Sequence, residues 1–162
     1  MPSHIEAIAV FDTKKIKGTV RFVEDVANNV VRIRINITGL KKSGKHGFHV
    51  HECGDMSEQC ESMCAHFDPF NTNHHGCPDA PSHSRHVGDL GNLITDKNGC
   101  ARYEMVDKMI KLRGQKSNII GRGLIIHADE DDCGLGNFSD SLTTGHSGKR
   151  IACAVIGYAQ MK

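Results

Sequence analysis

Histidine is the residue type with the greatest capacity for chemistry in this sequence. Eight of the 11 histidines lie between positions 46 and 86 of the 162-residue chain. Imidazole nitrogens bind zinc, copper, iron and nickel, so the cluster indicates a transition-metal site. A solvated loop with surface histidines would have the same composition, and only the spacing of the histidines separates the two interpretations.

The segment Gly47–His51 has the spacing of a metal chelate on a β-strand. Residues two apart on a strand share a face, so His49 and His51 point to one side while Phe48 and Val50 point to the other. One side can then hold an ion while the other enters a core. Cupin-fold enzymes use the same His-x-His pattern, so an iron or nickel dioxygenase built on these two histidines and a later one is an alternative.

Further candidate ligands follow this segment along the chain. They are His66, His74, His75, His86, Asp89 and His127. One carboxylate among several imidazoles is compatible with zinc. His127 ends the apolar run 124–126, and it can serve the same metal only if the fold returns it to His49 and His51.

The cysteines offer a competing metal site. Cys53, Cys60, Cys64 and Cys77 could bind structural zinc together with a histidine, although none has the Cys-x₂-Cys spacing of common zinc modules. The chain has seven cysteines, so at least one is unpaired within it. In a reducing cytosol, most of them are expected to be free thiols or metal ligands.

Short strands are the elements that must position these residues. Residues 31–38 alternate strictly between apolar and polar types, as in a strand with one wet face. Similar candidates are 8–11, 18–23, 48–51, 92–95, 101–106, 124–127 and 152–159. Eight short strands without a convincing helical stretch predict an antiparallel sandwich or barrel. No linker or repeat interrupts the chain, so a single domain over residues 1–162 is expected.

Two long segments, 52–85 and 129–149, break this rhythm and are rich in Gly, Ser, Asn, His and Asp. Loops of this length inside a compact domain are typically functional. The net charge of +1 gives no indication of a nucleic-acid or membrane-surface partner. Residues 1–11 lack a basic segment followed by a long apolar run, which predicts a cytoplasmic protein without a signal peptide.

Five stretches of the chain together resemble the copper/zinc superoxide dismutase family, in the family's order and at near-family spacing. They are Gly47–Glu52, His66–Pro69, Arg85–Asn92, Ile120–Arg122 and Arg150–Gly157. The resemblance implies an eight-stranded antiparallel Greek-key barrel or sandwich with two long functional loops. It also implies an antioxidant enzyme that disproportionates superoxide to oxygen and hydrogen peroxide, with one copper and one zinc per chain.

The resemblance assigns a metal ligand role to seven residues. It makes His49, His51, His66 and His127 the copper ligands. It makes His66, His75, His86 and Asp89 the zinc ligands. His66 therefore bridges the two ions, and the copper is alternately reduced and oxidised while His66 takes up and returns a proton.

Other positions match the family outside the ligand set. Asp131 matches the carboxylate that links a copper-side to a zinc-side histidine, and outer carboxylates of this kind fix the imidazole tautomer. Arg150 matches the arginine that attracts the anion beside copper. Cys60 and Cys153 match the family's intrasubunit disulfide. The other five cysteines match nothing, and they are expected to be inert buried thiols.

Some features depart from the family pattern. The doublet His74-His75 stands where one ligand is expected, and the following Gly-Cys-Pro favours His75. Cys53 replaces a phenylalanine common at the family's dimer contact; the family resemblance still implies a homodimer. A copper chaperone is a further expected partner. An inactive dismutase-like domain, such as that of a copper chaperone, would lack copper ligands or the arginine; all of them are present here.

Overall fold

The computed structural model describes residues 4–161 of the chain. Residues 1–3 and 162, at the two ends of the predicted domain, lie outside the described residues. Residues 1–3 also belong to the N-terminal segment on which the prediction of no signal peptide rests. Among residues 4–161, no helix is long and apolar enough to cross a membrane.

Within the described residues all eight predicted strands are present, and a short ninth follows them. The strands are β1 (Glu6–Asp12), β2 (Lys17–Asp25), β3 (Val30–Thr38), β4 (Lys45–His51), β5 (Asp89–Ile94), β6 (Ala101–Asp107), β7 (Gly123–His127), β8 (Arg150–Val155) and β9 (Gly157–Tyr158). The predicted last strand, 152–159, breaks at Ile156, so that β8 and β9 pair in different sheets. The all-β prediction is confirmed.

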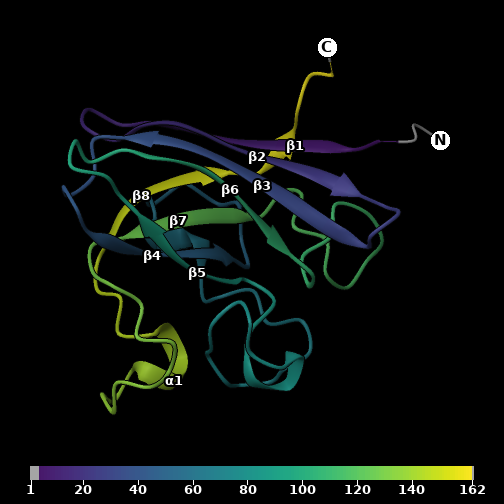
Figure 1. Cartoon of the computed structure of the whole chain (residues 1–162). Coiled ribbons are helices and arrows are strands. Elements are labelled where there is room, and N and C mark those ends of the chain that lie inside the picture. The colour runs from purple at the N-terminus through teal and green to yellow at the C-terminus, as the bar shows by residue number, and fades with distance from the viewer. Residues whose placement is uncertain (1–3, 162) are drawn as a thin grey trace.

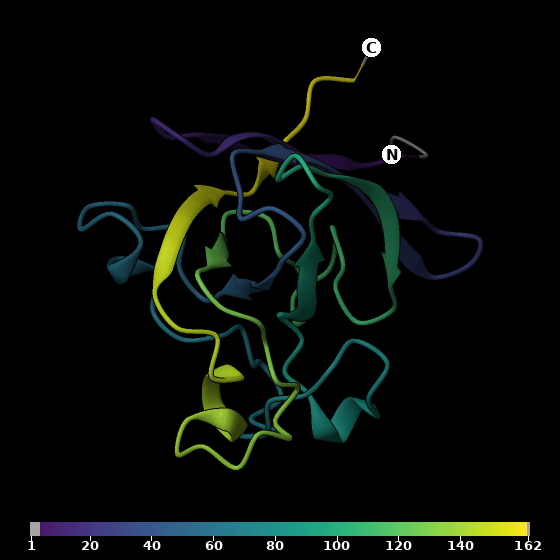
Figure 2. The same ribbon diagram turned by 60° about the vertical axis from the view of Figure 1, so that its left-hand side comes forward.

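The strands form two antiparallel sheets with the connectivity of a Greek key. One sheet has the order β6-β3-β2-β1-β9 and the other the order β5-β4-β7-β8. The chain crosses between the sheets after β3, β5, β6 and β8, so sequence neighbours are often not sheet neighbours. Figures 1 and 2 show the two sheets enclosing one core, with β8 (yellow) closing one side.

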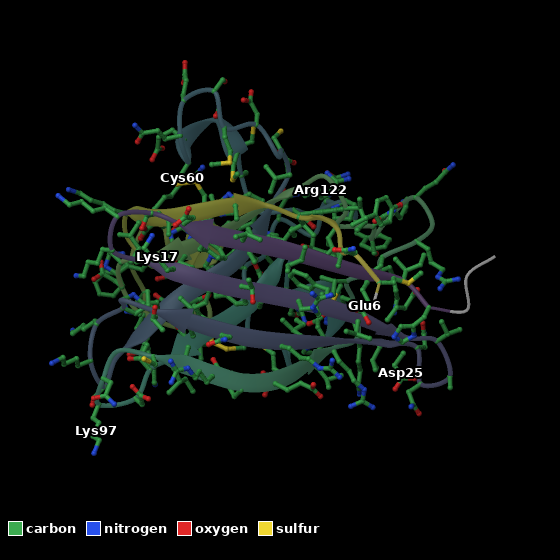
Figure 3. All side chains as sticks on the ribbon, turned by 90° about the horizontal axis from the view of Figure 1, so that it is seen from above. Glu6, Lys17, Asp25, Cys60, Lys97 and Arg122 are labelled. Carbon is green, nitrogen blue, oxygen red and sulfur yellow. A yellow bond between two sulfur atoms is a disulfide. The ribbon has the colours of Figure 1, made fainter. Side chains whose placement is uncertain are left out.

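Alternation along the strands divides core from solvent as the sequence predicts. On β3, Val31, Ile33, Ile35 and Ile37 are buried, while the side chains between them face outward. Figure 3 looks onto this outer face, where labelled charged residues such as Glu6 and Lys17 lie at the surface. The apolar faces of the two sheets pack against each other in a single core cluster.

Strand β4 departs from simple alternation because both of its faces are covered. Phe48 and Val50 enter the core, and His49 and His51, on the other face, are buried as well. The cover comes from the two long connections, 52–88 and 128–149. These contain two short 3₁₀ turns, η1 (Glu61–Met63) and η2 (Ser82–Ser84), and a single helical turn, α1 (Ser141–Thr144). In Figures 1 and 2 parts of both loops lie side by side at one end of the strands.

Candidate metal centre

Four histidines from three parts of the chain meet on the outer face of β4. His49 and His51 lie on β4, and His127 is the last residue of β7, which pairs with β4 in antiparallel register. His66 lies in the first long loop and forms an isolated β-bridge with His51. One ring nitrogen from each of these buried residues lies within 4.8 Å of the others. The fold therefore returns His127 to His49 and His51.

Hydrogen bonds on the far side of each ring decide which nitrogen faces the group. His51 Nδ1 donates to the carbonyl of Cys64 at 2.9 Å, and His127 Nδ1 donates to the carbonyl of Gly148 at 3.1 Å. A carbonyl only accepts, so in both rings Nδ1 carries the proton and Nε2 keeps a free lone pair. These two Nε2 atoms, His66 Nε2 and His49 Nδ1 are buried without a protein partner. Such inward-facing lone pairs are what a metal ion binds.

A second group lies on the other side of His66. His66, His75 and His86 each place Nδ1 close to the same oxygen, Oδ1 of Asp89, at 2.9, 3.0 and 3.1 Å. Four donors arranged tetrahedrally around zinc at about 2.0–2.1 Å would lie about 3.3 Å from one another. The other carboxylate oxygen of Asp89 accepts from the backbone N–H groups of Gly76 and His86. The donor set and its spacing therefore fit zinc.

Asp131 connects the two groups from outside. His49 Nε2 lies 2.6 Å from Asp131 Oδ2, and His75 Nε2 lies 2.8 Å from Asp131 Oδ1. The carboxylate is itself buried, and so are both rings. Because Asp131 accepts a hydrogen bond from the Nε2–H group of each ring, Nδ1 of both histidines is left to face the metal groups.

Burial sets the protonation of the first group. It lowers the pKa of His127 to about 4, and together with the neighbouring His66 it holds the pKa values of His49 and His51 well below the usual range. Burial also lowers the pKa of His66, although the Asp89 carboxylate opposes it. These rings are therefore neutral near pH 7, as metal ligands must be.

Charge pairing dominates in the second group. Burial disfavours the charged form of His75, but hydrogen bonds to Asp131 and Asp89 outweigh it and raise the His75 pKa to about 9. Burial alone would raise the pKa of Asp89. Hydrogen bonds from His66, His75 and His86 reverse this and hold the Asp89 pKa far below the usual range. The buried carboxylate thus supplies the negative charge that a divalent cation requires.

Arg150 stands beside the first group at the start of β8. Its Nη1 donates to the carbonyl of Cys60 at 2.8 Å and its Nη2 to the carbonyl of Cys64 at 2.6 Å. The guanidinium lines an open pocket together with His51, His66 and His127. A permanent cation is therefore held in a fixed position where a small anion would approach the three rings.

Two disulfides fasten the loops that carry this centre. Cys60 is joined to Cys153 on β8, as the family resemblance implied, and Figure 3 shows Cys60 close to the yellow strand. Cys77 is joined to Cys133, linking the two long loops. The alternative of a thiolate zinc site is therefore wrong, because two of its four cysteines are in disulfides.

The expectation for the five further cysteines is also wrong. Besides the Cys77–Cys133 bridge, Cys53, Cys64 and Cys100 are free thiols, and none of the five is buried. No strand or helix period relates the two cysteines of the second bridge, because each lies in an irregular loop. The position of each cysteine two residues after a site residue, His75 or Asp131, is the one signal that could have suggested it.

The structure resolves the histidine doublet and adds supporting residues. His75 enters the second group, whereas His74 is part-exposed and folds back onto the carbonyl of His75. His46, not anticipated as a site residue, donates from Nδ1 to the carbonyl of His127 at 2.8 Å and so helps to place that ligand. Asn92 exchanges two hydrogen bonds with the backbone of Asp131, at 2.7 and 3.0 Å.

Gly145 is a further residue that the sequence did not single out. Its φ of +68° is one that side chains rarely adopt, and a Cβ there would collide with the Asp131 carboxylate and the His75 ring. The second loop can approach this buried pair closely only because position 145 is glycine.

Comparison with known proteins agrees with this geometry. The family model described as "Copper/zinc superoxide dismutase (SODC)" matches residues 16–156. The chain belongs to the copper/zinc superoxide dismutase family. It is 59% identical over 156 residues to "Superoxide dismutase [Cu-Zn]" of Paramecium bursaria Chlorella virus 1, covering 96% of this chain and 80% of that protein. It is 48% identical to "Extracellular superoxide dismutase [Cu-Zn]" of Drosophila melanogaster, over 90% of this chain and 78% of that one.

A solved structure supports the fold of this dismutase independently. The crystal structure of a protein titled "clock protein EA4" superposes with a TM-score of 0.91 at 42% identity, covering 98% of each chain. The fold predicted from the sequence is thereby confirmed. The dismutase uses copper and zinc to convert superoxide to oxygen and hydrogen peroxide, so the cupin dioxygenase and the inactive domain are both wrong.

Proposed function

We propose that His66 is the shared ligand of copper and zinc in this dismutase and the group that moves a proton during turnover. One observation carries the proposal: among the described residues, His66 alone belongs to both four-residue metal-binding groups. Its Nδ1 faces the Asp89 group at 2.9 Å, and its Nε2 faces the other histidines without a protein partner. A single ring thus presents one nitrogen to each side.

The remaining ligand roles follow from the same geometry. His49 Nδ1, His51 Nε2 and His127 Nε2 complete the copper side, while His75, His86 and Asp89 complete the zinc side. Copper supplies a one-electron change of charge, which zinc cannot. His66 Nε2 can accept a proton in one half of the cycle and give it to the departing peroxide in the other. Nδ1 stays beside Asp89 throughout and keeps the ring in place.

Arg150 binds and orients the superoxide anion. Two carbonyl acceptors fix its guanidinium beside the pocket that reaches His51, His66 and His127. Its charge does not titrate near neutral pH, so it attracts the anion across the physiological range. Asp131 has a positioning role, because it holds His49 and His75 in one tautomer.

The cellular setting is part of the proposal. We propose a cytoplasmic, antioxidant enzyme of a single domain, whose two sheets share one main core cluster. A homodimer is proposed as well, with Ile151 and Val155 of β8, which are 37% and 38% exposed, as candidate contacts. A copper chaperone is the proposed source of the metal. Fractionation of the source cells, light scattering, and copper loading with and without a chaperone test these three points.

The central experiment measures metal content and superoxide consumption on the same purified protein. One copper and one zinc per chain are expected, with activity lost in His51→Ala and steeply reduced in Arg150→Ala. To test the shared ring, both groups are filled with Cu(II). Coupling through one imidazole should then reduce the EPR intensity, and His66→Ala should restore the intensity of two separate ions. Full intensity in the parent protein would refute the shared ligand.

A further inference from the structure

Two free thiols lie next to each other at the edge of the metal centre. The Sγ atoms of Cys53 and Cys64 are 3.2 Å apart. Cys64 is exposed and Cys53 is half-buried. Neither belongs to a metal-binding group, and neither takes part in the two disulfides.

The backbone holds the two cysteines in this position. The segments that carry them run antiparallel: Glu52 N–H donates to Ala65 O at 2.9 Å, and Cys53 N–H donates to Met63 O at 3.2 Å. The bridge between His51 and His66 continues the same pairing. A disulfide has an S–S bond of about 2.05 Å, so side-chain rotations that bring the two sulfurs roughly 1 Å closer would reach bonding distance. The main-chain hydrogen bonds of the loop therefore hold the two cysteines next to each other.

The exposed residue Cys64 also borders the pocket in which the reaction product is released. Cys64 lines the same pocket as His51, His66 and Arg150. Its carbonyl accepts hydrogen bonds from His51 Nδ1 at 2.9 Å and from Arg150 Nη2 at 2.6 Å. Hydrogen peroxide released from the centre therefore enters a pocket whose wall includes Cys64, the residue whose carbonyl positions two active-site groups.

We propose that Cys53 and Cys64 form a reversible third disulfide, with the enzyme's own product as oxidant. The Cys64 sulfur attacks one oxygen of hydrogen peroxide, the O–O bond breaks, and a sulfenic acid and one water form. The Cys53 sulfur then attacks the Cys64 sulfur, the S–O bond breaks, and a second water leaves. Two thiols lose two electrons and two protons, and one peroxide becomes two waters.

The link would act on the loop that holds Arg150. It closes a small ring between positions 53 and 64, and that ring contains Cys60, which is itself bonded to Cys153. Both carbonyls that orient the Arg150 guanidinium, those of Cys60 and Cys64, would then lie on a segment crosslinked at three cysteines. Peroxide accumulation would thus make this wall of the pocket more rigid.

The test counts thiols in the metal-loaded enzyme before and after hydrogen peroxide. Alkylation followed by intact mass spectrometry should find three reactive cysteines in the reduced state and Cys100 alone after peroxide. A non-reduced peptide map should show the Cys53 and Cys64 peptides joined. Mild dithiothreitol should restore all three thiols. Cys100→Ser is the matched control, because it removes a free thiol elsewhere and should leave the crosslink unchanged.

The variant Cys53→Ser separates the two chemical steps. It cannot form the bridge, so peroxide should leave Cys64 as a sulfenic acid that a dimedone reagent traps. Three results would overturn the proposal: three alkylatable thiols persisting after peroxide, Cys64 joined to Cys60 or Cys153 instead, or equal dimedone labelling of Cys64 in the parent and in Cys53→Ser. None of these readouts depends on which histidine bridges the metals.

Discussion

The disulfide between Cys77 and Cys133 should contribute a large part of the stability of this enzyme. It joins the two long loops next to the metal centre, where Cys133 N–H donates to Asp131 Oδ1 at 2.8 Å and His75 N–H donates to Leu142 O at 2.9 Å. The perturbation is the double variant Cys77→Ser/Cys133→Ser. It removes the bridge without turning either of its two cysteines into a free thiol.

The magnitude follows from the sequence separations of the two bridges. The Cys77–Cys133 loop spans 56 positions and lies inside the 93-position loop closed by Cys60–Cys153. Because the outer bridge already restricts the unfolded chain, the inner bridge removes less of its conformational entropy than an isolated 56-position loop would. Its effective loop length is about 20 residues, which corresponds to a stabilisation of about 3–4 kcal/mol in the chain-entropy model. At about 2–4 °C per kcal/mol for a chain of this size, the melting temperature should fall by roughly 10 °C.

Calorimetry at a fixed protein concentration is the appropriate assay, because dimerisation would make the melting temperature concentration-dependent. Cys100→Ser, which removes a free thiol outside the two long loops, should melt within about 2 °C of the parent. In the double variant zinc should also bind more weakly, since the loop carrying His75 is no longer fastened to the loop carrying Asp131. A double variant that melts with the parent would refute the reasoning, because the bridge would then constrain nothing.

Three other substitutions test the charges around the centre. Asp131→Asn should weaken copper and zinc binding about 10–100-fold, measured by competition with a chelator, since the amide has a single acceptor oxygen and one of the two rings loses its partner. Arg150→Ala should lower kcat/KM about tenfold or more at low ionic strength and remove most of its salt dependence, which stopped-flow assays of superoxide decay can measure. Glu61→Gln removes a negative charge from the pocket wall and should raise kcat/KM roughly twofold in low salt. Unchanged rates at 10 mM ionic strength, roughly a 30 Å screening length, would show that these charges do not steer the anion.

The strands and part of the centre could be read from local pattern. The alternation in β3 and the His-x-His of β4 state directly which side chains share a face, because the strand period of two depends on no distant residue. The resemblance to the family then gave a role to His66, Asp89 and Arg150, and the structure brings them together in the expected groups.

Long-range placement was decided by the tertiary structure alone. The Gly-Cys-Pro after the doublet favoured His75, but only the folded loop shows that the His75 ring faces inward. Nothing local links Cys77 to a cysteine 56 positions away. The approach of Cys53 to Cys64 depends on backbone pairing between the two ends of an irregular loop. The physical reason is that irregular loops have no repeating period: their contacts depend on the closure of the whole chain and on the sheets that the loops cover.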